Sequence, residues 1–350
     1  MLGTYRLALA LMVALSHVGL TIAGLNPGVM AVAGFYLVSG YVMTGLLRTH
    51  YAGTTRIGAF FADRALRLYP HYLAIAALTL AAFLLLGLRT PFLAIEPSAA
   101  DLARNLAIVP LNFYMFNHAD RFTLIPPAWS LGAEVQFYLI VPFLLLGTGA
   151  RFRDLAIVSS VIVFLFAAAG RIDSDYFGYR LLPGVLFVFL LGSRLYDLEH
   201  GAQGRALGWP LCIAVCGAAA LVAAALAASG QLTLPYNREL LIGLCVGILA
   251  LQFLSRLPRR RFDEALGALS YGVFLNHFLV VWLLFHSRIS GAGAMLAYAG
   301  SCLVVAFLGY RLIERPVLRL RRKLRNDGAK FAAAGSVSTV DETPSHGSAP

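Results

Sequence analysis

The stretch GVMAVAGFYLVSGYVMTGLL, residues 28–47, holds twenty consecutive residues without a charged side chain. A helix needs roughly 20 apolar residues to cross about 30 Å of hydrocarbon. Because backbone amides in lipid must be hydrogen-bonded within their own segment, such a stretch forms a helix. The sequence therefore predicts a membrane-spanning helix here.

Similar apolar segments recur along most of the chain. The 350 residues are 59% hydrophobic and only 13% charged, with a mean hydropathy of +0.75, whereas soluble domains carry about 25% charged residues. We predict an all-α, polytopic integral membrane protein of about ten transmembrane helices. Their expected spans are residues 5–24, 28–47, 71–88, 129–146, 155–170, 181–196, 209–228, 240–254, 266–286 and 292–312.

The distribution of basic residues predicts the orientation of these spans. If the N-terminus is cytoplasmic, 21 of the 28 lysines and arginines fall on cytoplasmic segments. This bias follows the positive-inside rule and predicts that both termini are cytoplasmic. We expect residues 5–24 to be retained as the first helix, because no clear signal-peptide cleavage site follows them.

Two stretches are not expected to span the membrane. Residues 90–128 form a polar, proline-containing loop on the outer side, long enough to suggest a functional role. The transmembrane domain is expected to comprise residues 1–316, followed by a cytoplasmic tail, residues 317–350, that is first basic and then disordered.

Composition also excludes some classes of function. The net charge of +11 does not indicate nucleic-acid binding, because the cations lie in short patches between apolar runs and no binding module is present. All four cysteines lie in apolar segments and form no Cys-x-x-Cys pair, so neither a disulfide framework nor a metal site is predicted.

The first span contains two ionisable residues, Arg6 and His17. They are 11 residues apart, about three helical turns, so they share one face and lie roughly 16 Å apart along the axis. Arg6 is expected at the cytoplasmic rim and His17 past the midplane. The structural alternative is an arginine that reaches the interface and a histidine bonded to a backbone carbonyl.

Other polar residues are also unusual in or near a membrane. Glu134 enters the fourth span from the outer side, where an unpaired carboxylate is costly, so it requires a partner or a function. Arg64 and Arg67 lie in the predicted inner loop; on a helix they would be neighbours and could bind a phosphate together. Ordinary positive-inside charge is the alternative for this pair, and a buried structural histidine is the alternative for His277.

Six motifs follow one another along the chain: the Arg6–His17 spacing, FYLVSG (35–40), RALR followed by LYP (64–70), WSLGAE followed by QFY (129–138), SYGVFLNH (270–277) and YRLIERP (310–316). Together and in this order they resemble the signatures of acyltransferase family 3, bacterial membrane enzymes that O-acylate sugars of envelope or exported glycans. Departures are small: Gly132 and Ala133 stand where Ser-Val is common, and Asn276 where an aromatic residue is common.

The resemblance implies an O-acyltransferase of the inner (plasma) membrane. Its donor would be acyl-coenzyme A, chiefly acetyl-coenzyme A, with no tightly bound cofactor. Its acceptor would be a sugar hydroxyl of an envelope polysaccharide, glycolipid or exported glycan. His17 would act as the general base for direct attack by the acceptor hydroxyl, with a transient acyl-histidine as the alternative. Glu134 would orient His17 or stabilise its charge, while Arg6, Arg64 and Arg67 would bind the coenzyme A phosphates.

Trp129, Tyr138 and Ser39 are assigned to substrate binding, although interfacial anchoring would equally explain the aromatic residues. For Ser270, His277 and Glu314 helix packing is the expected role. Two other functions stay open from the sequence: a transporter or flippase of a glycan or lipid precursor, and a non-catalytic envelope scaffold. An intramembrane serine hydrolase using Ser39 is disfavoured, because Leu37 stands where a rhomboid-like site has glycine.

Overall fold

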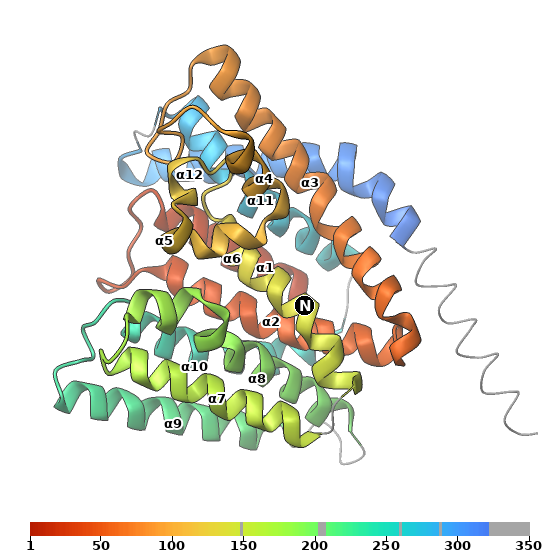
Figure 1. The fold of residues 1–350 in the computed structure, drawn as a ribbon, viewed down its shortest axis with the longest axis vertical. Coiled ribbons are helices and arrows are strands. Elements are labelled where there is room, and N and C mark those ends of the chain that lie inside the picture. Colours follow the sequence, from red (N-terminus) through yellow and green to blue (C-terminus); the bar gives the residue numbers. More distant parts are fainter. Residues whose placement is uncertain (148–149, 202–207, 259–260, 287–288, 322–350) are drawn as a thin grey trace, which may run out of the picture.

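The computed structural model describes residues 1–147, 150–201, 208–258, 261–286 and 289–321. Within these ranges the chain is helical and forms no β-strand (Figure 1). The α-helices are α1 (Leu2–Ser16), α2 (Pro27–Thr49), α3 (Ile57–Leu86), α4 (Ala99–Ala107), α5 (Tyr114–Asn117), α6 (Ala128–Pro142), α7 (Ala150–Ala168), α8 (Leu182–His200), α9 (Gly208–Ala228), α10 (Asn237–Ser255), α11 (Arg261–Leu284) and α12 (Gly291–Gly309).

Each of the ten predicted spans coincides with one of these helices. Eight helices are long and apolar enough to cross a membrane, while α1 is shorter and α7 begins with three charged residues. The all-α, multi-pass membrane architecture is thereby confirmed. The count of ten and the cytoplasmic termini stay predictions, and residues 322–350 of the expected tail lie outside the described residues.

Three boundaries differ from the prediction. Helix α3 begins at Ile57, so the expected inner loop around Arg64 is helical and continues through Pro70. Helix α1 ends at Ser16, because Gly19 adopts a φ of 95° that ends the helix; His17 is therefore its C-cap rather than a mid-span residue. The expected loop at residues 90–128 contains the short helices α4 and α5.

Helices α1, α2 and α6 lie in the middle of the molecule (Figure 1). The group α3, α11 and α12 lies on one side of them and the group α7–α10 on the other. Helix α2 packs against α8 and α10. At the crossing of α2 with α8, Gly40 faces the backbone of Phe189, and Gly192 faces the backbone of Leu37. A side chain at either glycine would collide with backbone atoms, so small residues permit this close approach.

Helix α1 packs most extensively against α11, to which it runs parallel. At one end the Asp263 carboxylate accepts hydrogen bonds from the backbone N–H groups of Gly3 and Thr4, at 3.1 and 2.8 Å. At the other end His17 contacts His277. Both contacts join residues 260 positions apart, so the two helices keep one register along their length. Asp263 caps the orphan amides of α1 and holds this register.

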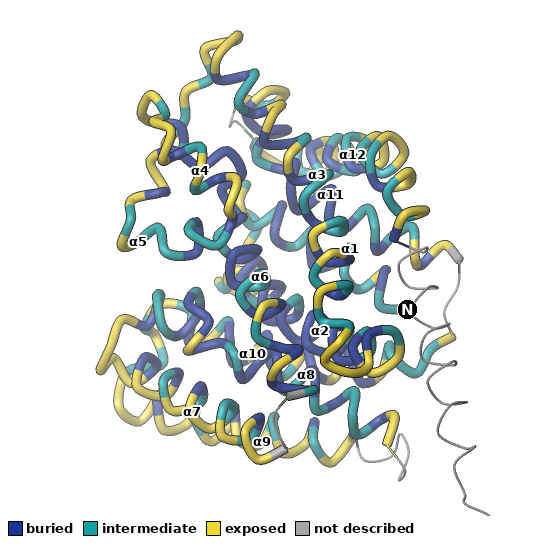
Figure 2. Tube along the Cα trace, turned by 45° about the vertical axis from the view of Figure 1, so that its right-hand side comes forward, coloured by how far each residue is buried: buried dark blue, intermediate teal, exposed yellow. Residues whose placement is uncertain are grey.

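Several helices have exposed faces (Figure 2), and those of α9 and α12 are apolar. Only 22% of the apolar segment of α9 and 17% of the apolar segment that includes α12 is buried inside the protein. Leu221 and Leu296 are 75% and 74% exposed. An apolar helix that the fold leaves uncovered is suited to contact with lipid chains. The ionisable residues of interest lie instead among the central helices.

Candidate active site: an arginine pocket and a histidine pair

A pocket lies where α1, α2, α3, α6 and α11 meet. Its cavity volume is about 80 Å³. Six of the eight predicted site residues line it, although they come from four different helices: Arg6, Ser39, Arg64, Arg67, Glu134 and Tyr138. Ser130, Ser270 and Tyr271 add further polar groups, and Phe35, Phe274 and Leu131 add apolar ones. We call this the arginine pocket.

The carboxylate of Glu134 is held by two hydroxyl groups. Ser39 Oγ donates to Glu134 Oε1 at 2.8 Å, and the Tyr138 hydroxyl donates to the same oxygen. Tyr138 lies one turn after Glu134 on α6, whereas Ser39 comes from α2. The carboxylate is therefore oriented at the pocket wall by hydroxyl groups rather than neutralised by a cation.

The three arginines of the pocket have different partners. Arg64 pairs with Asp63, and its guanidinium lies 5.9 Å from the ring centroid of Tyr138. Arg67 pairs with Glu314 at 2.7 Å and stacks 4.9 Å from the ring of Tyr271. Among the described residues no carboxylate forms an ion pair with Arg6. Arg6 therefore offers the guanidinium of the pocket whose donors are least engaged by the protein.

Glu314 has a larger part in this arrangement than the sequence indicated. It ends a π-helical turn, Tyr310–Glu314, that interrupts the last helix. One carboxylate oxygen binds Arg67, and the other lies 2.9 Å from Nδ1 of the buried His71. This bears out a structural role for Glu314 and adds that it positions Arg67. The signal in the sequence was an acidic residue at the end of an apolar span, with no partner nearby in the chain.

His17 lies outside the arginine pocket, at the opposite end of α1 from Arg6. Its side chain is exposed, and its Nδ1 lies 2.9 Å from the carbonyl oxygen of Val13. Nε2 of His277 lies 3.3 Å from the same Nδ1, and the two rings stack with centroids 5.2 Å apart. The ring of Phe278 lies 4.9 Å from His17. We call His17 and His277 the histidine pair.

The predicted contact between His17 and Glu134 is not formed in the described structure. His17 bonds Val13 and His277, while Glu134 bonds Ser39 and Tyr138. The reason is the spacing along α1. Arg6 lies in the pocket, and His17, 11 residues further along the helix, lies about three turns away and outside it. His277, for which the sequence favoured a packing role, is the actual neighbour of His17.

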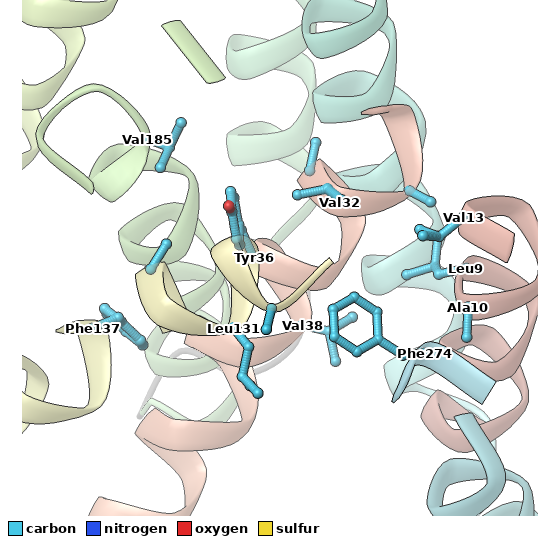
Figure 3. Close-up of a cluster of buried hydrophobic side chains, with 14 of the residues drawn as sticks. Leu9, Ala10, Val13, Val32, Tyr36, Val38, Leu131, Phe137, Val185 and Phe274 are labelled. Carbon is cyan, nitrogen blue, oxygen red and sulfur yellow. The ribbon is translucent and has the colours of Figure 1, made fainter. Parts of the chain in front are cut away.

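One aromatic ring, that of Phe274, lies between the arginine pocket and the histidine pair. Phe274 lines the pocket, and its ring centroid is 6.4 Å from that of His277, one turn further along α11. Phe35 also lines the pocket and meets Phe274 edge-on at 6.3 Å. Figure 3 draws Phe274 within the buried apolar cluster formed by α1, α2 and α6. Through Phe274 the two regions share an aromatic wall.

Trp129 does not line the pocket. Its ring lies 4.6 Å from the guanidinium of Arg180, which also pairs with Asp175. The ring of Tyr179 lies 5.1 Å from that of Trp129. The predicted substrate-binding residue is therefore packed within a cation–π cluster beside the pocket.

Comparison with known proteins bears on the chemistry of these two regions. The sequence profile of the family described as "Acyltransferase domain" matches residues 5–311. An uncharacterized protein of Aquifex aeolicus is 36% identical over 204 residues, covering 57% of this chain and 90% of that protein. An uncharacterized protein of Haemophilus influenzae is 25% identical over 189 residues, which cover 49% and 75% of the two chains.

A Staphylococcus aureus protein named "Putative O-acetyltransferase" is 28% identical over 189 residues. The match covers 47% of this chain and 31% of that longer protein. No solved structure matches. The family profile spans both the arginine pocket and the histidine pair, and the chain belongs to acyltransferase family 3, a family of membrane O-acyltransferases.

Proposed function

We propose that this enzyme transfers an acyl group of about acetyl size from acyl-coenzyme A to a sugar hydroxyl of an envelope polysaccharide, glycolipid or exported glycan. The observation that carries the proposal is the convergence of three guanidinium groups on one pocket, with an exposed histidine at the other end of α1. Anions with several phosphate oxygens are bound by such arginine clusters. The inner (plasma) membrane is the location that this chemistry requires, because coenzyme A is cytosolic.

The arginine pocket is suited to the donor. Arg64 and Arg67 are held in place by Asp63 and Glu314, so their side chains lose little conformational freedom when a phosphate binds. Arg6, with no carboxylate partner among the described residues, supplies uncompensated positive charge. The apolar side chains of the wall, Phe35 and Phe274 among them, suit the pantetheine arm and the acyl group.

The histidine pair is suited to the acceptor. His17 takes the proton of the attacking sugar hydroxyl, whose oxygen forms the new ester bond to the acyl carbon. The bond between that carbon and the thioester sulfur breaks, and coenzyme A leaves as a thiol after it receives the proton. His17 caps the carbonyl end of α1, where the positive charge that it acquires is favourable.

Direct transfer brings the thioester past the wall formed by Phe35 and Phe274. We assign Glu134 to the donor side of the reaction, where Ser39 and Tyr138 orient its carboxylate. Its earlier assignment as the partner of His17 is replaced by this role. Acceptors and lipids reach the protein from the membrane and its outer side.

The test uses membranes that contain the wild-type protein, His17→Gln or His200→Gln at matched amounts. They receive radiolabelled acetyl-coenzyme A and a crude envelope-glycan extract, and coenzyme A release and alkali-labile label on the glycan are followed. His200 is a matched control, because its Nδ1 also lies near the carbonyl oxygen four residues earlier, at 3.0 Å.

We expect the wild type and His200→Gln to label the glycan, and His17→Gln to be slower by about 10²- to 10⁴-fold. Labelling that survives His17→Gln would exclude His17 as the base. If the wild type labels no glycan and releases no coenzyme A above membranes without the protein, the proposed donor and acceptor are wrong.

A further inference from the structure

The hydrogen-bond partners of the two histidines determine where their protons lie. Nδ1 of His277 is 2.9 Å from the carbonyl oxygen of Phe274 and 3.2 Å from that of Val273. A carbonyl oxygen can only accept a hydrogen bond, so Nδ1 of His277 must carry a proton. In the neutral ring Nε2 then has a free lone pair, and it accepts.

The same reasoning applies to His17. Its Nδ1 faces the carbonyl oxygen of Val13 at 2.9 Å and the lone pair of His277 Nε2 at 3.3 Å. Both neighbours accept, so Nδ1 of His17 must be the donor and divides its hydrogen bond between them. With the proton on its other nitrogen, a bare Nδ1 would face two acceptors at these distances, which is repulsive.

A protonated His277 would not relieve this arrangement. If Nε2 of His277 carried a proton, it would donate to Nδ1 of His17, which would then have to be bare. That bare nitrogen would face the Val13 carbonyl oxygen at 2.9 Å. His277 is fully buried, which further disfavours a charge on its ring.

We propose that His277 is a positioning residue that, together with the carbonyl oxygen of Val13, fixes His17 in the tautomer with a bare Nε2, the nitrogen that takes the proton of the acceptor hydroxyl. This deepens the proposed function and rests on it. No described residue bonds Nε2 of His17, and the side chain is exposed, so this nitrogen is open to a substrate. When it takes a proton, the hydrogen bonds at Nδ1 strengthen and stabilise the imidazolium.

The backbone around the pair is held by a third helix. The Tyr298 hydroxyl on α12 lies 3.1 Å from the carbonyl oxygen of His277 and 3.4 Å from that of Ala14. Together with the Asp263 cap at the other end of α1, this contact fixes the register of α1 on α11 and so holds His277 next to His17. The register of α1 on α11 therefore selects the tautomer.

Three variants of His277 test the role. His277→Leu removes the acceptor and is expected to lower kcat roughly 10- to 100-fold while the KM for acetyl-coenzyme A stays unchanged. His277→Gln places an amide oxygen near the position of Nε2 and is expected to recover most of the lost rate. His277→Asn places its amide near Nδ1 instead and is expected to recover little. All are compared at equal amounts of monodisperse protein.

A spectroscopic measurement identifies the tautomer of His17 without an activity assay. Wild-type protein labelled with ¹⁵N-histidine in lipid vesicles is compared with His17→Gln, which identifies the His17 resonances. We expect the shifts of a protonated Nδ1 and a bare Nε2 in the wild type. In His277→Leu only the Val13 carbonyl oxygen still favours the proton on Nδ1, so we expect a partial shift toward the other tautomer.

A protonated Nε2 in the wild type, or an unchanged tautomer in His277→Leu, would overturn the inference. So would His277→Gln being as slow as His277→Leu at equal amounts of folded protein. The proposed function fails separately, through full transfer by His17→Gln, whatever the spectra show.

Discussion

The arginine pocket and the histidine pair differ in how their polar groups are held. In the pocket, Arg64 and Arg67 are paired with carboxylates, and Glu134 is held by two hydroxyl groups. In the histidine pair no charged group of the described residues bonds either ring, and backbone carbonyl oxygens orient both rings. A pocket for an anion needs fixed positive charge, whereas proton transfer needs a neutral ring whose bare nitrogen faces the substrate. In the proposed function, the arginine pocket binds the donor and the histidine pair carries out the proton transfer.

His17→Gln is expected to have the largest effect, and it tests whether proton transfer belongs to the histidine pair. We expect kcat to fall about 10²- to 10⁴-fold, because the proton of the acceptor hydroxyl loses its base, while the KM for acetyl-coenzyme A stays within about twofold. Initial rates over a range of donor concentrations separate the two constants, with His200→Gln as control. A raised KM with unchanged kcat would mean that His17 belongs to donor binding, and the division would be lost.

Glu314→Gln tests how the pocket holds its charge. Removing one partner of a buried ion pair leaves Arg67 uncompensated, which costs about 3–5 kcal/mol of stability. We expect a clear fall in the Tm measured in detergent. The double variant Arg67→Met with Glu314→Gln should be less destabilised than the sum of the single changes. Additive losses would show that the two side chains are not energetically coupled.

Arg6→Ala tests the unpaired cation of the pocket. A hydrogen bond to a charged group contributes about 1.5–3 kcal/mol, so kcat/KM for the donor should fall roughly 10- to 100-fold through KM. Arg6→Lys keeps the charge and should lose less. Arg89→Ala, on a side chain that is 53% exposed and pairs with Glu96, serves as the control. If Arg6→Ala lowers kcat alone, Arg6 acts on the chemical step instead.

Phe274→Leu changes the wall shared by the two regions. A smaller side chain should admit longer acyl groups, so the rate with butyryl-coenzyme A relative to acetyl-coenzyme A should rise several-fold, as expected for pockets that discriminate by methylene groups. Phe253→Leu is the matched control, because Phe253 is 58% exposed on α10. An unchanged ratio would mean that Phe274 does not limit acyl length.

The smallest effect is expected outside both regions, in α4. The Ser98 hydroxyl, with help from Arg104, holds the pKa of the Asp101 carboxyl below its ordinary value of 3.8. Because the folded pKa is lowered, this stabilisation is complete above pH 3.8 and is lost as the pH falls through the folded value.

Ser98→Ala should cost about 0.5–2 kcal/mol at neutral pH and weaken the acid dependence. Hydrogen exchange of the α4 amides between pH 5 and 3 measures the stability of this segment and its dependence on pH. The KM for the donor and kcat should not change. A change in either constant would connect this segment to the site.

Much of the architecture could be predicted because it depends on local chemistry. Apolar runs of about 20 residues become helices wherever they meet lipid, and each of the ten predicted spans overlaps a helix. The signatures near Ser39, Arg64 and Glu134 indicated residues that do line one pocket. The ends of helices were less predictable: Pro70 did not stop α3, and Gly19 ended α1 early.

By itself the sequence determined the membrane class, the helices, the family and the positions of the ionisable residues along each helix, since hydropathy and helical periodicity depend only on neighbours in the chain. Only the tertiary structure decided which of those residues meet. The 260-residue offset between α1 and α11 brings His277, rather than Glu134, to His17, and Glu314 reaches Arg67 across 247 residues. Such pairs depend on helix packing and on glycine-mediated close approach, which no local pattern encodes.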